Sequence, residues 1–350
     1  MPQNPTIRRP NARDVNILYD LYRYRAMTTE QIKKRYFANS KSYVNQKLHA
    51  MRNSHLITTF SVPRGDGKKG IACHRLTDTG ITCLKEQGVS VRHKAKDLLV
   101  TPGAIHYLLA ANDIMIELSS YGWEMRDSRE TKEIYNLNRG DIIHGTLISP
   151  EGKEYGIYVL MADTMQYNIA KIIQEIRSTS MGEVGLTNFI IFTKGAASFS
   201  HFIERATAPK VNPANPFDDA QPLIVGGSLC VLPYRFGIEY LKALTIDNGL
   251  VKLFAKYGQI TSVQNKTPFK WLIRRDGEEK YLVNLLDTDL MMIHDLKRYL
   301  THQYQEDGHR VLIMTHMRNE HEDLLEGAFG IDFQEIDPKE IEAVVSKGGV

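Results

Sequence analysis

The sequence predicts an α+β protein in two parts: an N-terminal winged helix-turn-helix followed by an α/β body. Three observations carry this prediction. The first hundred residues read helix, helix, helix, β-hairpin, helix, which is the order of a winged helix. Strands and helices alternate through the rest of the chain, as they do in α/β proteins. The charge changes at the same boundary, because residues 1–100 hold 19 Lys and Arg against 7 Asp and Glu, whereas the remainder holds 25 against 34.

The composition is that of a globular protein, with 42% hydrophobic and 24% charged residues in a chain of 350. No apolar run approaches the roughly 20 residues that span a membrane, and the N-terminal segment lacks the apolar stretch of a secretory signal. The cysteines Cys73, Cys83 and Cys230 are far apart and odd in number, which favours a reducing compartment over a disulfide framework or a zinc site. We therefore expect a cytoplasmic protein with no membrane partner.

The winged helix is predicted over residues 13–96, after a polar, Pro-rich and flexible arm over residues 1–12. Its second helix begins at Thr28, because Thr28 and Gln31 form a capping-box pattern. Its third helix follows the sequence ANSKS, which supplies Asn or Ser as the N-cap. Two short β-type runs around a Gly- and Lys-rich turn form the wing, and the sequence TDTG begins one more helix.

The third helix is expected to read DNA, because its outward face holds side chains that can reach base edges in a major groove. Lysines beside this face suit phosphates, and Lys47 is one of them. In the arm, Arg8 and Arg9 are candidates for minor-groove contacts. The predicted DNA-binding residues are Lys41, Ser42, Asn45, Gln46, His49, Arg52 and Asn53 on the third helix, Lys33 and Lys34 on the second, and Arg64, Lys68 and Lys69 in the wing.

The body is predicted to contain an α/β domain over residues 100–245 and a second, related unit over residues 250–345. Both read β-hairpin, helix, strand, helix, and such an internal repeat is more informative than a single motif. The hairpins are predicted to turn at Pro150–Lys153 and at Asp276–Gly277. Asp163 and Thr164 match Asp287 and Thr288 at an offset of 124, and Thr193 matches Thr315 at an offset of 122.

Several motifs together resemble the replication-relaxation family of plasmids and other mobile elements. They are TDTG after the wing, the helix IHYLLAAND with its grouping of His106, Asn112 and Asp113, and the sequence GDIIHGTL. The resemblance covers roughly residues 10–200. It implies a plasmid, phage or integrative element as the setting, the bacterial cytoplasm and nucleoid as the location, and a degenerate, restriction-endonuclease-like α/β core. Within that core Asp141 matches the first Asp of the family pattern.

A metal-dependent nuclease acting on DNA is the alternative function. Such an enzyme needs clustered carboxylates for Mg²⁺ and usually a nearby Lys, and Asp141, Glu151 and Lys153 imitate this set. However, Pro150 and Gly152 predict a hairpin tip there, and the next strand, YVLMADT, lacks the expected carboxylates. We therefore predict no catalytic residue, no metal site and no cofactor, and we interpret the turn and the pair of His106 and Asp113 as structural.

The function that the sequence favours is sequence-specific binding of double-stranded DNA, in transcription control or in replication and transfer. A homodimer is expected, because one recognition helix reads too few base pairs for useful specificity. The acidic body would mediate oligomerisation or bind a protein partner. A third possibility is a winged helix that binds protein instead of DNA.

Overall fold

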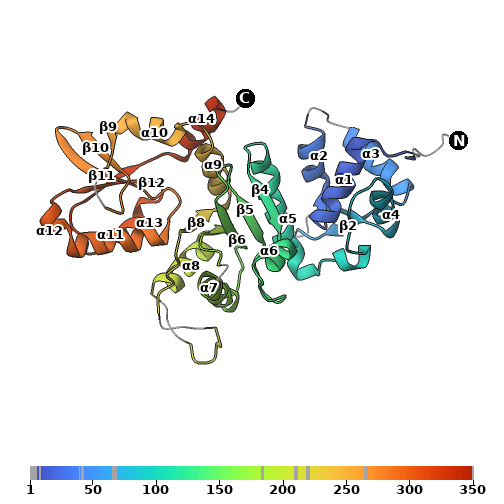
Figure 1. Cartoon of the computed structure of the whole chain (residues 1–350), viewed down its shortest axis with the longest axis horizontal. Coiled ribbons are helices and arrows are strands. Elements are labelled where there is room, and N and C mark those ends of the chain that lie inside the picture. Colours follow the sequence, from blue (N-terminus) through green and yellow to red (C-terminus); the bar gives the residue numbers. More distant parts are fainter. Residues whose placement is uncertain are drawn as a thin grey trace. The chain divides into compact units, whose positions relative to one another are not determined.

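The structure is a computed structural model that describes residues 6–7, 9–38, 40, 43–64, 69–182, 185–208, 212–217, 221–263 and 267–348. It has the mixed α+β composition that the sequence predicts. The chain divides into two compact units, Met1–Ser120 and Tyr121–Val350 (Figure 1). In the described part of the chain, none of the helices has the length and hydrophobicity that crossing a bilayer requires.

The first unit holds a bundle of helices and a small antiparallel sheet in the order β1-β3-β2. Capping boxes begin two of its helices: Asn11 with Asp14, and Thr28 with Gln31, the second of which the sequence predicted. Its elements are α1 (Ala12–Arg23), β1 (Met27–Thr28), α2 (Thr29–Tyr36), α3 (Tyr43–Asn53), β2 (Ile57–Val62), β3 (Ile71–Leu76), α4 (Asp78–Glu86), the 3-10 turn η1 (Ala95–Leu98) and α5 (Pro102–Ser119).

Helix α5 differs from the predicted division of the chain. The sequence placed it at the start of a domain over residues 100–245, but it belongs to the first compact unit. The physical reason is its apolar face, since Ile105 and Leu109 share a core cluster with Ala26, Val62 and Cys73 of the preceding elements.

The second unit begins with a five-stranded sheet in the order β4-β5-β6-β7-β8. The first three strands are antiparallel, and β6, β7 and β8 are parallel. The elements of this first repeat are β4 (Glu124–Asp127), α6 (Ser128–Ile134), β5 (Gly145–Ile148), β6 (Glu154–Leu160), α7 (Gln166–Ser180), β7 (Phe189–Thr193), α8 (Ala196–Thr207), β8 (Leu229–Pro233) and α9 (Tyr234–Leu244).

A second five-stranded sheet follows, in the order β9-β10-β11-β12-β13, with the same sequence of antiparallel and parallel pairings. The elements of this second repeat are α10 (Gly249–Phe254), the 3-10 turn η2 (Ala255–Tyr257), β9 (Gln259–Ser262), β10 (Trp271–Arg275), β11 (Glu278–Asn284), α11 (Leu290–His302), α12 (Tyr304–Asp307), β12 (Val311–Thr315), α13 (Arg318–Leu324), β13 (Ile331–Glu335) and α14 (Pro338–Gly348).

The two repeats agree in detail where the sequence predicted they would. The N–H of Thr164 donates to the carbonyl of Met161, and that of Thr288 donates to the carbonyl of Leu285, both at 3.1 Å. Both hairpins turn at the predicted tips, and Asp276 and Gly277 adopt the positive φ of a tight two-residue turn.

The repeats do not form separate domains, although the sequence predicted separate units over residues 100–245 and 250–345. One core cluster contains Tyr158, Ile191 and Val231 of the first repeat with Tyr281 and Ile313 of the second. Apolar side chains from both sheets therefore stabilise one compact body.

Candidate nucleic-acid interface

Helix α3 presents a polar face outward and an apolar face inward. Val44, Leu48 and Met51 are at most 2% exposed, which confirms the predicted inward face. The outward face is the one on which the sequence placed DNA-reading residues. Of these, Asn45, Gln46 and Arg52 are exposed, and His49 and Asn53 are half-buried, whereas Lys41 and Ser42 lie outside the described residues.

A buried ion pair fixes α3 to α1. The Lys47 ammonium lies 2.6 Å from a carboxylate oxygen of Asp14, and the side chains are 12% and 1% exposed. A phosphate contact by Lys47, as the sequence predicted, would have to compete with this ion pair inside the domain. Asp14 also closes the capping box of α1 with Asn11, so one carboxylate starts α1 and positions α3.

A second buried carboxylate fixes α2 to α1. Asp20 accepts a hydrogen bond from the Tyr36 hydroxyl and forms an ion pair with Arg35. Burial raises the pKa of Asp20, and the charge of Arg35 opposes that rise. Because breaking one partner of a buried pair is costly, α1 acts as a rigid support for both following helices.

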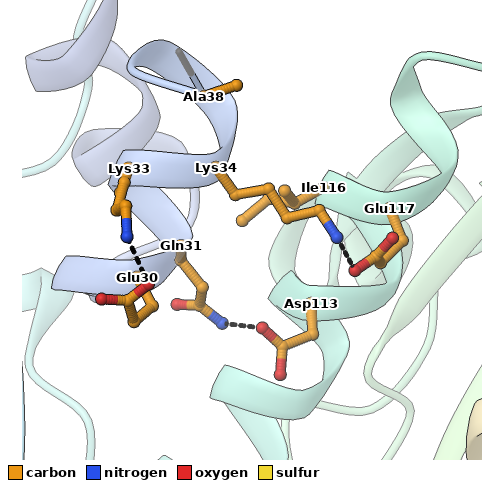
Figure 2. A pocket seen from close by; sticks show the side chains of 8 residues that line it. All are labelled: Glu30, Gln31, Lys33, Lys34, Ala38, Asp113, Ile116 and Glu117. Atoms are coloured by element: carbon orange, nitrogen blue, oxygen red, sulfur yellow. Dashed lines mark hydrogen bonds and ion pairs between the residues drawn. The ribbon is translucent and has the colours of Figure 1, made fainter. Parts of the chain in front are cut away.

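The basic residues of α2 are paired with acids. Figure 2 shows a groove of about 360 Å³ between α2 and α5, in which Lys33 lies 3.5 Å from Glu30 and Lys34 forms an ion pair with Glu117. A phosphate would have to compete with these carboxylates for either lysine. The groove is lined by Glu30, Gln31, Lys33, Lys34, Ala38, Asp113, Ile116 and Glu117.

The β2–β3 hairpin carries exposed cations near its turn. Arg64 and Lys69 are both exposed, whereas Lys68 lies outside the described residues. At the other end of the hairpin, the imidazole of His74 lies between two hydroxyls, 2.9 Å from Thr29 and 2.9 Å from Thr59. This buried clamp ties the hairpin to the start of α2, so the hairpin is held in place relative to α2.

Burial, with a smaller contribution from the charge of Arg52, lowers the pKa of His74 to about 4. The ring is therefore neutral at physiological pH. A neutral imidazole has one donor and one acceptor nitrogen, and each can pair with a hydroxyl.

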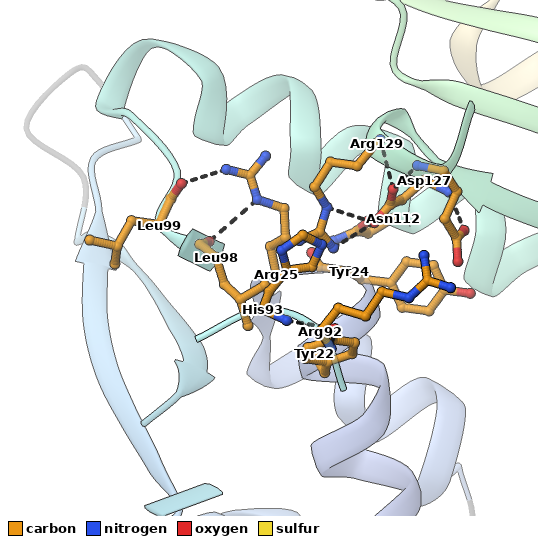
Figure 3. A network of polar contacts seen from close by, with 11 residues as sticks. Tyr22, Tyr24, Arg25, Arg92, His93, Leu98, Leu99, Asn112, Asp127 and Arg129 are labelled. Carbon is orange, nitrogen blue, oxygen red and sulfur yellow. Dashed lines mark hydrogen bonds and ion pairs between the residues drawn. The ribbon is translucent and has the colours of Figure 1, made fainter. Parts of the chain in front are cut away.

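Helix α5 holds the first unit together through side-chain amides. The Asn112 amide donates to the Tyr24 and Ala26 carbonyls at 3.3 Å and 2.7 Å, and Gln31 donates to Asp113 and to the Leu109 carbonyl. Figure 3 shows Asn112 at the end of α1. In the same view, Arg25 donates to the carbonyls of Leu98 and Leu99. Asp113 thus has a structural contact, in line with its interpretation from the sequence, and Asn112 has one as well.

Sequence reasoning missed an aromatic group at the start of α3. Tyr43 is 45% exposed and packs edge-on against Phe37 at 5.6 Å, and the Arg13 guanidinium lies over Phe37 at 5.3 Å. The pattern "KSY" at the helix start was the available signal. Arg9 of the arm is exposed, whereas Arg8 lies outside the described residues. The arm is not wholly free, since the Ile7 N–H donates to the Ser54 hydroxyl at 2.7 Å.

The residues of the nuclease alternative do not gather into one site. Asp141 accepts from the Asn138 N–H in a local turn before β5, whereas Glu151 and Lys153 are exposed at the hairpin tip after it. A four-residue strand, about 13 Å long, separates the two places. In the ranges that the structure describes, no group of three or more His, Cys, Asp or Glu side chains is placed to hold a metal ion.

Glu175 is a buried acid that contacts the residue after Asp141. Both its oxygens accept the Ile142 N–H at 2.8 Å, and burial raises its pKa to about 7. The contact fixes the start of the β5 segment to α7. We therefore interpret the Glu175 carboxylate as a structural group and not as a catalytic one.

Residues 18–142 match the protein family described as Replication-relaxation, which confirms the resemblance drawn from the sequence for this part of the chain. The match includes α2, α3, the hairpin and all of α5. No curated protein and no solved structure matches the chain significantly.

Proposed function

We propose that the chain is a sequence-specific double-stranded DNA-binding protein of a plasmid, phage or integrative element. The match of residues 18–142 to the family described as Replication-relaxation supports this proposal. Residues 13–96 would be its winged helix-turn-helix, with α3 in the major groove. The protein would act in replication and transfer or in transcription control, in the bacterial cytoplasm and at the nucleoid.

The observation that carries this proposal is the exposed row of Asn45, Gln46 and Arg52 on a helix that buried contacts hold rigid. Amides recognise adenine and a guanidinium recognises guanine through paired hydrogen bonds. A rigid support matters, because a base-reading side chain must be placed within a fraction of an ångström.

The hairpin supplies the second contact that a winged helix makes. Arg64 and Lys69 are exposed beside its turn and suit phosphates or a minor groove. By contrast, Lys33 and Lys34 are tied to acids, so we assign them a smaller share of DNA affinity than the sequence suggested. The α/β body, whose order of elements resembles that of a restriction endonuclease, would mediate oligomerisation or bind a protein partner.

The test is selection of bound duplexes from a random pool, followed by affinity measurements on the selected duplex. Gln46→Ala and Arg52→Ala should each weaken specific binding by about 1–3 kcal/mol and relax one position of the site. The control is Lys85→Ala, which removes an exposed charge from α4. Selection of no sequence, or equal affinity of all variants, would contradict the proposal.

A further inference from the structure

Besides their shared core, the two repeats of the second unit are joined by backbone hydrogen bonds at one sheet edge. The turn Leu285–Asp289, which we name the docking turn, lies on the outer edge of β8. The Val231 N–H donates to the Asp287 carbonyl at 3.0 Å, and the Leu229 N–H donates to the Asp289 carboxylate at 2.9 Å. The open edge of the first sheet is thus covered by a turn of the second repeat.

The first repeat has the same turn, but its surface is exposed. This turn is Met161–Met165, which we name the first-repeat turn, and it has the same internal hydrogen bond as the docking turn. Met165 is 67% exposed, and Tyr167 just after it is 48% exposed, although Phe217 packs against its ring. Ala162 and Gln166 are also exposed, whereas their counterparts at the docking turn, Leu286 and Leu290, are 0% and 4% exposed.

The second repeat has the matching edge. Strand β13 occupies the place of β8, and in both sheets the first residue of the fourth strand donates to the carbonyl just before the fifth, at 2.8 Å and 2.9 Å. Since the backbone of a strand points alternately to its two sides, the Ile331 and Phe333 N–H groups face away from β12, as do those of Leu229 and Val231 from β7. Among the described residues, β13 pairs with β12 alone.

We propose that the first-repeat turn of one copy, in which Asp163 and Met165 are exposed, docks on the β13 edge of a second copy, repeating between chains a contact that joins the two repeats within one. The Phe333 N–H would donate to the Asp163 carbonyl, and Met165 and Tyr167 would be covered. The two surfaces differ, so the contact is head-to-tail and builds open chains or a closed ring. The partner is a second copy because the interface already exists in this fold.

The contact between copies is weaker than the one within the chain. Asp289 both caps α11 and accepts from the β8 edge, but its counterpart Met165 has no carboxylate. Charged Asp332 and Glu335 on β13 also limit open-ended strand pairing. Association is therefore reversible and depends on protein concentration.

The first test is sedimentation velocity of the full chain, without DNA, over a range of concentrations. The average mass of the wild type should rise above 39.9 kDa. Met165→Glu should weaken association by at least about tenfold, because it places a charge in the contact. Met181→Glu is the matched control, since Met181 is a 77% exposed methionine at the other end of α7, and it should behave as the wild type.

Mixing two variants tests the head-to-tail geometry. Phe333→Pro removes the outward N–H, and an edge strand tolerates proline on that side; an unchanged melting temperature checks its fold. Met165→Glu keeps an intact edge and Phe333→Pro keeps an intact turn, so their mixture should form a one-to-one dimer that neither forms alone.

A wild type that stays monomeric, or a Met165→Glu variant that associates like the wild type, would overturn the proposal. If Phe333→Pro does not fold, the comparison of Met165→Glu with Met181→Glu decides alone. Each outcome is independent of DNA binding.

Discussion

The two helices at the centre of the first unit, α2 and α3, both carry basic and polar side chains, yet the structure uses them differently. On α2, Lys33, Lys34 and Arg35 each contact an acid. On α3, Arg52 contacts the His49 ring, and in the described ranges no acidic side chain pairs with it. The difference teaches that local positive charge does not identify a DNA contact. A basic residue is available to DNA only if the fold has not already paired it.

The largest expected effect is on stability, and it comes from the ion pair between Asp14 and Lys47 that fixes α3 to α1. Asp14→Ala leaves the Lys47 ammonium nearly buried without its partner, so unfolding should become easier by about 3–5 kcal/mol. Chemical denaturation measures this loss. The double variant Asp14→Leu with Lys47→Met should recover most of the stability, because no charge remains buried. A loss below about 1 kcal/mol in the single variant would show that the pair does not hold α3.

The His74 clamp gives a pH dependence with a defined sign. Its pKa is about 4 in the folded protein and 6.5 in a free histidine, so the unfolded chain binds the proton first. Its contribution is complete above pH 6.5 and is lost as the pH falls towards 4. At pH 5 the clamp should have lost about 2 kcal/mol.

The His74 contribution is isolated by comparing wild type with His74→Gln, because other buried groups oppose it. The raised pKa of Glu175, for example, stabilises the fold as the pH falls. The difference in unfolding free energy between the two proteins should shrink by about 2 kcal/mol from pH 7 to pH 5. If the difference in unfolding free energy does not change with pH, protonation of His74 is not the cause of the pH dependence.

A smaller effect is expected on the salt dependence of DNA affinity, which should differ between a lysine paired with an acid and an exposed lysine without such a pair. Lys69→Ala should lower the salt dependence of DNA affinity by about one counterion, because in the proposed complex the exposed Lys69 beside the hairpin turn would neutralise a phosphate. Lys33→Ala should leave the salt slope nearly unchanged, since Glu30 already accompanies that charge. The slope of the logarithm of affinity against the logarithm of salt concentration gives both values. Equal slopes for the two variants would remove the distinction between them.

Local signals in the sequence predicted much of this fold. The capping box at Thr28, the tip at Asp276–Gly277, and the inward face of α3 each depend on residues within a few positions of one another. The duplicated body was predicted in the same way, because Asp163-Thr164 and Asp287-Thr288 mark equal turns.

The features that could not be predicted from the sequence depend on contacts between residues that are far apart in the chain. Lys34 and Glu117 are 83 positions apart, and Lys47 and Asp14 are 33 positions apart, so nothing in either local pattern indicates a pair. The division of the chain was wrong for the same reason. Helix α5 is joined to the first unit by Gln31 and Asn112, which act across more than 75 positions.

The most direct test of the central claim compares one available and one paired cation on the same selected duplex. Arg52→Ala should lose more than about tenfold in specific affinity and lose the preference for one base, whereas Lys34→Ala should stay within about threefold of the wild type. If instead Lys34→Ala loses as much as Arg52→Ala, or if Arg52→Ala binds the selected duplex unchanged, α3 is not the reading helix.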